Sequence, residues 1–538
     1  MSTSNQPMQL ICVDEQHFPE IRKKCGVYVD KTRALYNCIQ DGKYFFISRP
    51  RRFGKSLLCS TLAALFAGKK DLFKGLWIES SDWAWEEYPV LHFDMTRASS
   101  PTNTADNVKN GLMLQLQTFA QQHGIVGIAQ PNHEQYFSEL IKALHAKTGK
   151  QVVVIVDEYD KPLLDVIEHK DRYMAIQEVL RGFYGQLKAS SEHLRFVLLT
   201  GVFKFAKTSV FSGLNNLQDL TFNPDAAELL GYTQQEINDN FPEHIQGMCK
   251  KLSKNHAEFF EILQEQYNGY AFGIDTDNAT INGAVYNPFA INHVFHRQQL
   301  VEQWFASATP TFLIQKLKER SFAGFDPSEL VFSFGELNDS CNPDKITALS
   351  LLYYAGYMTL KAYNKRQKTV SIDFPNAEVA QAFSGALLQE IMNRPISSFG
   401  IITRKINDLF YANNLQELKE TLNQALAQMP YHLFGTQESY YQSIIYLLFN
   451  ASSVVTLAED MMNRGRMDIT VLLPESVYIF ELKMNQSATV ALQQIKSRDY
   501  AAKYRHLGRK IYAVGIELSN GDRIIKDLQF EMLWQSVR

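Results

Sequence analysis

Short apolar runs alternate with amphipathic stretches from about residue 42 to 222, and this alternation predicts a parallel sheet covered by helices. The apolar runs have strand length, and the stretches between them carry apolar residues at three- and four-residue spacing, as helices do. Right-handed crossovers would place all the strand ends at one edge of the sheet, where ligands of open α/β sheets bind. The predicted strands are Tyr44–Ile47, Val90–Phe93, Val152–Val156 and Phe196–Leu199, and the predicted helices include Lys55–Phe66 and Asp106–Gln122.

The pattern changes after this region. The pattern predicts helices across residues 225 to 345. A helix start is indicated by Thr233, which is followed three residues later by Glu236. From 346 to 385 the order is helix, strand pair Tyr357–Tyr363 and Thr369–Phe374, then helix from Ala377, which is the outline of a winged-helix-like module. We therefore expect four regions: 1–225, 226–345, 346–430 and 431–538.

Length and composition agree with several folded domains. A chain of 538 residues exceeds one compact core, and 45% hydrophobic with 21% charged residues excludes a disordered protein. The net charge of −3 argues against a globally basic nucleic-acid binder, although a local basic face stays possible.

The cysteines and the N-terminus bear on location. The six cysteines form no C-x-x-C pair, which indicates reduced thiols. The first thirty residues lack a signal peptide, and no window approaches the roughly 18 uninterrupted apolar residues of a membrane span. We expect a cytoplasmic protein that does not enter a membrane.

One segment has the context of a phosphate-binding loop. The sequence from Arg49 to Ser56 follows a predicted strand and opens a predicted helix. Gly54 would let the backbone approach phosphates, Lys55 would reach the terminal phosphates, and the Ser56 hydroxyl would bind Mg²⁺. Arg49 stands where the usual pattern has Gly. The arginines would contact phosphate or, alternatively, an acidic surface. The residues expected to hold nucleotide are Arg49, Arg52, Phe53, Gly54, Lys55, Ser56 and Asp157.

A second motif follows about a hundred residues later, where the buried strand Val152–Val156 ends in Asp157 and Glu158. Asp157 would hold Mg²⁺ through water, and Glu158 would orient or deprotonate the attacking water. Thr200, after the next strand, would sense the γ-phosphate or would be a simple turn residue. The alternative is that neither motif has a function: the first would be a chance helix start, and the second would be two solvated acids at a strand end.

Near the C-terminus, the runs Ile469–Leu473 and Val477–Phe480 predict a hairpin. Pairing would place Asp468 opposite Glu481 or one step away, roughly 5 Å apart at the Cβ atoms. Glu481 and Lys483 are two positions apart on one strand, so they project from the same face. One face of the hairpin would carry both acids and the ammonium.

This trio has the chemistry of a metal-dependent nuclease. Close carboxylates repel one another unless a cation lies between them, so Asp468 and Glu481 would bind Mg²⁺ or Mn²⁺. The metal would polarise a phosphate and acidify a water molecule, while Lys483 would position that water or stabilise developing charge. The alternative is an ordinary exposed hairpin with Glu–Lys pairs.

The surrounding pattern favours the nuclease. Predicted helices Ser439–Phe449 and Ser487–Leu507 flank the hairpin, and a strand Lys510–Ile516 follows, which is the core order of the restriction-endonuclease-like fold. Glu438 or Glu459 could add an acid, and Gln494 could turn towards the metal. A possible phosphate-backbone face, or else an ordinary solvated helix, is formed by Lys496, Arg498, Lys503, Arg505, Arg509 and Lys510.

Taken together, the motifs resemble bacterial and archaeal proteins that join an AAA-ATPase-like N-terminal domain to a PD-(D/E)XK nuclease superfamily domain. The resemblance covers almost the whole chain. The matching segments are Tyr28–Thr32, Arg49–Ser56, Asp157–Pro162, Thr200–Val202, Ser212–Asn216, Tyr267–Tyr270, Tyr286–Phe289, Pro375–Val379 and the set Asp468, Glu481 and Lys483.

The resemblance implies roles for these residues. Lys55 and Ser56 would bind ATP and Mg²⁺, Tyr28–Thr32 would line the nucleotide base, and Glu158 would serve hydrolysis with Asp157. The C-terminal trio would be the nuclease centre, although Gln442 stands where the family pattern leads us to expect His.

Our first hypothesis is an ATP-binding, ATP-hydrolysing switch that controls a Mg²⁺-dependent endonuclease acting on DNA, in defence against mobile elements or in genome maintenance. AAA-like cores often form rings, so the hypothesis admits a homo-oligomer. The rival is a regulatory or signalling NTPase whose C-terminal domain binds nucleic acid or a partner without cutting.

Overall fold

The computed structural model describes residues 8–100, 102–204, 210–211, 214, 216–300, 330–338, 347–392, 396–429, 438–462, 465–519 and 523–535. Ser212, Gly213 and Asn215 of one matched motif therefore lie outside the described residues. The chain divides into two compact units. Unit 1 comprises Met1–Val301 and Phe332–Asp373, and unit 2 comprises Glu302–Val331 and Phe374–Arg538. The boundary between Asp373 and Phe374 falls inside the segment predicted as a winged-helix-like module.

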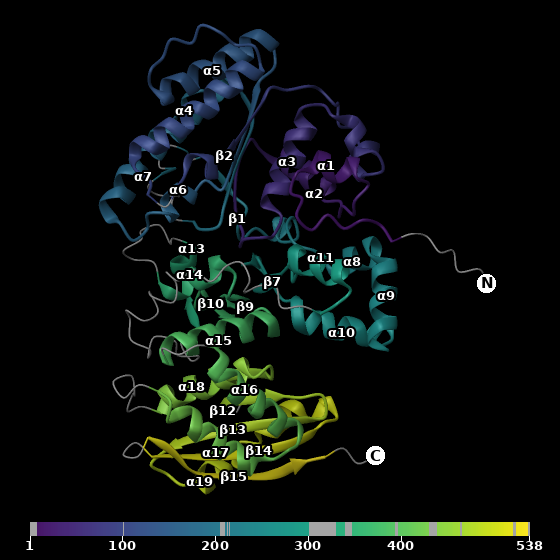
Figure 1. The fold of residues 1–538 in the computed structure, drawn as a ribbon, viewed down its shortest axis with the longest axis vertical. Helices are drawn as coiled ribbons and strands as arrows, with labels where there is room; N and C mark the ends of the chain where they lie inside the picture. Colours follow the sequence, from purple (N-terminus) through teal and green to yellow (C-terminus); the bar gives the residue numbers. More distant parts are fainter. Residues whose placement is uncertain are drawn as a thin grey trace, which may run out of the picture. The chain divides into compact units, whose positions relative to one another are not determined.

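Unit 1 is built on a parallel sheet with the strand order β2-β3-β4-β1-β5 (Figure 1). The four predicted strands are confirmed; three of them extend by one residue, and the strand predicted at Phe196–Leu199 extends by two residues at each end. Because β3 is buried on both faces, its sequence is an unbroken apolar run rather than an alternating one. The strands are β1 Tyr44–Ser48, β2 Val90–Asp94, β3 Val152–Asp157, β4 Leu194–Gly201 and β5 Gln218–Asp219.

Helices cover both faces of this sheet. On one face α4, α5 and α7 pack together over a core that includes Leu91 and Phe93 of β2, and on the other face α3 packs against β2 and β3 (Figure 1). The predicted helix Lys55–Phe66 is confirmed at both ends. The helices are α1 Phe18–Lys23, α2 Thr32–Asp41, α3 Lys55–Phe66, α4 Ala105–Gln122, α5 His133–Thr148, α6 Lys161–Leu164 and α7 Lys170–Ala189.

The rest of unit 1 is mainly helical, as predicted, with its own apolar core. The capping pair is confirmed, because the Thr233 hydroxyl accepts from the Glu236 amide while the Glu236 carboxylate accepts from the Thr233 amide. A short hairpin, β6 with β7, was not predicted. The elements are α8 Gln234–Asn240, α9 Pro242–Leu252, α10 His256–Tyr267, β6 Gly273–Asp275, β7 Thr280–Asn282, α11 Pro288–Arg297, β8 Val331–Ser333, α13 Phe334–Asn338, α14 Ala348–Ala355, β9 Thr359–Asn364 and β10 Thr369–Asp373.

Unit 2 contains a mixed sheet with the strand order β11-β12-β13-β14-β15, in which only β13 and β14 are parallel. The predicted hairpin is β12 with β13. The edge strands β11 and β15 were not predicted. The elements are α15 Ala377–Met392, α16 Ile396–Tyr411, α17 Leu415–Leu426, α18 Glu438–Ala451, β11 Val455–Met462, β12 Gly465–Leu472, β13 Ser476–Met484, α19 Ala488–Ser497, β14 Lys510–Ser519 and β15 Ile524–Trp534.

The prediction of one long helix from Ser487 to Leu507 was wrong. Helix α19 ends at Ser497, and a 3₁₀ helix spans Tyr500–Leu507. Asp499 between them has a φ of 47°, in the left-handed region that an α-helix cannot contain. The apolar spacing continues across the break, so periodicity alone does not show it.

Among the described residues, no helix combines the length and the apolar character needed to cross a membrane. The five described cysteines, Cys12, Cys25, Cys38, Cys59 and Cys249, form no disulfide. Cys341 lies outside the described residues.

Candidate functional sites

The predicted phosphate loop joins β1 to α3. Gly54 caps the helix with a φ of 90°, a conformation that glycine adopts without strain. Lys55 is buried, and its Nζ donates to the carbonyl oxygens of Arg49 and Pro50, each at 2.9 Å. Burial lowers the pKa of Lys55, and the nearby carboxylate of Asp157 opposes this shift. The ammonium therefore lies inside the loop, at the N-terminus of the 12-residue helix α3, where backbone amides have no partner within the helix and can bind an anion.

Arg49 makes its hydrogen bonds within the protein, and its predicted contact with phosphate stays a prediction. Its side chain is buried, with 1% exposed, and its guanidinium donates to the carbonyl oxygens of Ser48 at 2.8 Å, Thr221 at 2.9 Å and Ala226 at 3.0 Å. The guanidinium carbon also lies 4.3 Å from the centre of the Phe272 ring. The structure thus gives Arg49 a structural role that ties the loop to the segment after β5.

Arg52 and Phe53 also make packing contacts. Phe53 is buried edge-on against the rings of Tyr270 and Phe272. Arg52 adopts a φ of 67°, and its guanidinium carbon lies 3.8 Å from the ring centre of Phe289. The predicted contact of both residues with nucleotide stays a prediction.

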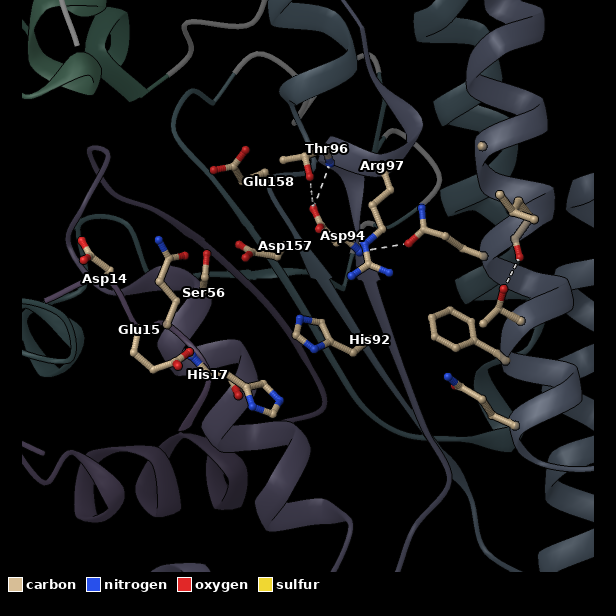
Figure 2. A pocket seen from close by; sticks show the side chains of 18 residues that line it. Asp14, Glu15, His17, Ser56, His92, Asp94, Thr96, Arg97, Asp157 and Glu158 are labelled. Atoms are coloured by element: carbon tan, nitrogen blue, oxygen red, sulfur yellow. Dashed lines mark hydrogen bonds and ion pairs between the residues drawn. The ribbon is translucent and has the colours of Figure 1, made fainter. Parts of the chain in front are cut away.

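The acids of the second motif face the loop helix. Thr200 Oγ1 donates to Asp157 Oδ1 at 2.7 Å from the neighbouring strand, so Thr200 contacts the acid rather than forming a turn. Glu158 has a φ of 53°, and burial raises its pKa while the charge of Lys55 opposes the shift. A cavity of about 940 Å³ is lined by Ser56, Asp157 and Glu158 among others (Figure 2). The two predicted motifs therefore meet at one cavity.

A smaller cavity of about 70 Å³ is lined by Gly54 of the loop. Tyr28 and Val29 line it together with Phe53 and Tyr232, so its wall is largely apolar and aromatic. The family resemblance alone predicted that Tyr28–Thr32 would line the nucleotide base. No motif in the sequence indicated that Tyr232 would line this cavity.

In unit 2 the hairpin register is Ile469 opposite Phe480, which leaves Asp468 at the next position, beside Glu481. Asp468 Oδ2 accepts from the backbone amide of Leu482 at 2.7 Å. Lys483 Nζ donates to Glu481 Oε1 at 2.8 Å. The structure therefore brings the three predicted side chains together on one face.

Glu481 is the most buried acid of this centre, with 1% exposed. Burial raises its pKa to about 7, and the negative charge of Asp468 adds to the shift. Its Oε1 accepts from Lys483 and from Gln494 Nε2, whereas its Oε2 is buried without a hydrogen-bond partner among the described residues. A buried carboxylate oxygen without a donor, beside a second carboxylate, fits a divalent cation with a preference for oxygen ligands.

Two further side chains, Glu438 and Gln442, contact the trio or the backbone beside it. Glu438 Oε2 accepts from the Met484 amide at 2.6 Å, and its Oε1 lies 3.9 Å from Lys483 Nζ. Gln442 Nε2 donates to the Asp468 carbonyl at 3.1 Å, so it braces the backbone at the position where the resemblance suggested His. Of the two proposed extra acids, Glu438 lies at the centre. The side chain of Glu459 lies outside the described residues.

The predicted basic face is largely engaged in local contacts. Lys496 pairs with Glu531 at 2.6 Å, and Arg505 pairs with Asp499. Arg509 donates to the Leu473 carbonyl at 3.1 Å. These pairs are exposed and weak, so they do not prevent a second use of the charges.

Comparison with known proteins agrees with this geometry. The model of a family described as predicted AAA-ATPase matches residues 13–211, and the model of the PD-(D/E)XK nuclease superfamily matches residues 436–528. An uncharacterized protein in the vnfD 5′ region of Azotobacter chroococcum mcd 1 is 34% identical over 530 residues, covering 96% of this chain and 98% of that protein. The chain belongs to this family of AAA-ATPase-like proteins with a PD-(D/E)XK nuclease superfamily domain.

The AAA-ATPase-like match covers the loop and strands β1 to β4 of the parallel sheet, and the nuclease-superfamily match covers β11 to β14 and the start of β15, with Asp468, Glu481 and Lys483. The chain is thus an enzyme with an ATPase domain and a nuclease-superfamily domain. The crystal structure of Cdc6p from Pyrobaculum aerophilum aligns over 72% of this chain and 97% of that chain, with 10% identity and a TM-score of 0.22. The fold assignment rests on the strand order described above.

Proposed function

We propose that this protein binds and hydrolyses ATP in unit 1 and thereby controls a Mg²⁺-dependent endonuclease in unit 2 that cuts DNA. The observation that carries the proposal is the convergence of Asp468, Glu481 and Lys483 beside a buried Glu481 oxygen that has no donor in the described part of the chain. Defence against mobile elements, or genome maintenance, in the cytoplasm is the biological setting we infer for such an activity.

For ATP, the chain offers each group that phosphoryl transfer to water needs. The Lys55 ammonium would exchange the carbonyl oxygens of Arg49 and Pro50 for terminal phosphate oxygens. Ser56 and Asp157 line one cavity and would hold Mg²⁺, while Glu158 would take the proton of the attacking water. The apolar cavity beside Tyr28 and Gly54 suits the adenine base.

For cleavage, Asp468 and Glu481 would hold a divalent cation. When bound, this ion supplies Lewis acidity to the scissile phosphate and lowers the pKa of a water ligand. The Gln494 amide and the Lys483 ammonium hold Glu481 in one orientation through Oε1, which leaves Oε2 for the cation. Lys483 also lies where it can donate to a negatively charged phosphate oxygen.

A plasmid-cleavage assay with and without ATP and Mg²⁺ tests the proposal. We expect cleavage that requires Mg²⁺ and falls by a factor of about 10² or more in Lys483→Ala, because this ammonium acts on developing charge. Lys496→Ala is the matched control, since Lys496 pairs with Glu531 on the same domain. We expect it to cleave within about twofold of the unchanged protein.

Lys55→Ala separates control by ATP from cleavage itself. We expect it to lose ATP binding and the ATP dependence of cleavage while the nuclease centre stays intact. If the correctly folded, unchanged protein cuts no nucleic acid with any divalent ion, the rival function as a regulatory NTPase with a non-cutting C-terminal domain replaces the endonuclease.

A further inference from the structure

A second group of metal-binding side chains lies beside the ATP site. Cys59 Sγ, a ring nitrogen of His92 and a carboxylate oxygen of Asp157 all lie within 4.8 Å of one another. They come from three different elements: Cys59 from α3, His92 from β2 and Asp157 from the end of β3. The cluster combines a thiol, an imidazole and a carboxylate, so it differs in chemistry from an ordinary group of surface acids.

The fold brings these residues together for definite reasons. Side chains alternate along β2, so Leu91 and Phe93 enter the core under α4 and α5 while His92 faces α3. In the sheet Asp94 pairs with Asp157, which places His92 two residues back along the neighbouring strand. Helix α3 packs against both strands and buries Cys59 between them.

We propose that Cys59, His92 and Asp157 form a binding site for a thiophilic divalent cation of the Zn²⁺ class. Tetrahedral Zn²⁺ with bonds of about 2.0–2.3 Å holds its ligand atoms about 3.5 Å apart, so a small inward movement of the side chains completes the site. A thiolate and an imidazole select Zn²⁺ over Mg²⁺, because Mg²⁺ prefers oxygen ligands in an octahedral arrangement.

Access and support for the ion are also present. His92 and Asp157 line the cavity of about 940 Å³, and both point into it in Figure 2, so an ion and a water ligand can enter from solvent. Cys59 is fully buried beside these two ligands, and on metal binding its thiol proton passes to solvent. Thr200 Oγ1 donates to Asp157 Oδ1 at 2.7 Å, so this hydroxyl fixes the orientation of the carboxylate and leaves its other oxygen for the ion.

The site would have a regulatory consequence, which rests on the proposed function. Asp157 is also the acid that would serve the Mg²⁺ ion of bound ATP, and Ser56 lies one helical turn before Cys59. An ion held by Cys59 and His92 draws Asp157 away from that task. Zn²⁺ therefore inhibits ATP binding or hydrolysis, even when Mg²⁺ is in large excess.

The test uses the full-length protein, stripped of metal with a chelator and titrated with Co²⁺ in place of Zn²⁺. Co²⁺ bound by a thiolate gives a charge-transfer absorption band, and the nuclease centre offers no thiol among its described residues. We expect one Co²⁺ per chain with this band, displaced by Zn²⁺ at equal concentration, because Zn²⁺ binds such sites more tightly than Co²⁺.

Substitutions assign the band to this cluster. Cys59→Ser should abolish it, His92→Gln should weaken Co²⁺ binding at least about tenfold, and Cys38→Ser on α2 should leave it unchanged. His92 is only half-buried, so its variant reports on the site even if Cys59→Ser fails to fold. No band in the unchanged protein, or a band that survives in both site variants, would overturn the proposal.

The Co²⁺ band also separates this inference from the proposed function. It forms without nucleotide, so its absence refutes the cation site whether or not the protein binds ATP. In a nucleotide-binding assay, Zn²⁺ should weaken the binding of Mg²⁺-ATP at least about tenfold in the unchanged protein and much less in His92→Gln. Equal effects of Zn²⁺ on both proteins would refute the regulatory role.

Discussion

Asp160 is a fully buried acid three residues after Asp157. Its Oδ2 accepts from the amides of Val202 at 3.0 Å and Phe203 at 2.7 Å, yet burial outweighs these bonds and raises its pKa to about 6. The folded state therefore holds the proton more tightly than the unfolded state, in which the pKa has the ordinary value of 3.8. The stability from this proton is complete below about pH 4 and is lost as the pH rises through about 6.

We expect Asp160→Asn to remove this pH dependence. The amide keeps an acceptor for the two backbone donors but carries no titrating group. Chemical denaturation of unit 1 should show that the unchanged protein loses on the order of 3 kcal/mol between pH 4 and pH 7 relative to the variant. A constant difference between the two proteins across this range would contradict the assignment.

Single residues also show what the sequence could and could not predict. The positions of Lys55 and Ser56 at the start of a helix and of Asp157 at the end of a strand were predictable, because each belongs to a known pattern, while their roles stay predictions. The burial of Arg49 was not predictable, because its carbonyl partners on Thr221 and Ala226 lie more than 170 residues away. Gln494, by contrast, lies only 13 residues after Glu481, and the sequence already suggested it as a side chain that could turn towards this centre, where its amide donates to Glu481 Oε1.

Among the elements, the packing of α19 on β14 depends on one glycine. A Cβ atom on Gly515 would lie 2.2 Å from the carbonyl oxygen of Ala488 and 3.1 Å from Leu492. Gly515 also pairs with Glu481 in the sheet, and α19 carries Gln494. Any displacement of the helix therefore reaches the nuclease centre.

We expect Gly515→Ala to destabilise unit 2 by about 1–3 kcal/mol, because a backbone oxygen cannot move aside as a flexible side chain can. Mg²⁺-dependent cleavage should fall as well. The control is Gly385→Ala in α15, where an added Cβ meets no atom within 4 Å. That variant should gain up to about 1 kcal/mol from helix propensity. Denaturant unfolding followed by circular dichroism measures both, and equal effects would refute the packing argument.

The elements were predictable where burial alone sets the pattern. The strands β1, β3 and β4 lie inside the sheet and show as unbroken or nearly unbroken apolar runs, and the edge strand β2 still shows three apolar residues in the four of Val90–Phe93. The edge strand β15 mixes exposed Phe530 and Met532 with charged residues, so its pattern carries no clear period. The helix break at Asp499 comes from its left-handed backbone conformation, which the spacing of apolar residues does not predict. The boundaries at 225, 345 and 430 stay predictions.

On the scale of the whole molecule, the chain contains two compact units with separate cores and separate candidate sites. We expect calorimetry of the metal-free protein to show two unfolding transitions. ATP with Mg²⁺ at about 100 times its Kd should stabilise unit 1 by about 2.7 kcal/mol, and this stabilisation should vanish in Lys55→Ala. Without ATP, a divalent ion should raise the unfolding temperature of unit 2, and Glu481→Gln should abolish that increase. A single transition that moves with either ligand would contradict independent units.

The order of segments along the chain also affects synthesis. Unit 1 ends with Phe332–Asp373, and its β9 strand supplies Thr359, whose Oγ1 accepts from the Ala271 amide at 2.7 Å. Unit 1 therefore cannot complete its fold until the ribosome has translated past Asp373, and until then apolar surfaces of unit 1 stay exposed. Slow codons placed just before the β9–β10 hairpin would prolong that exposure and increase the demand for chaperones.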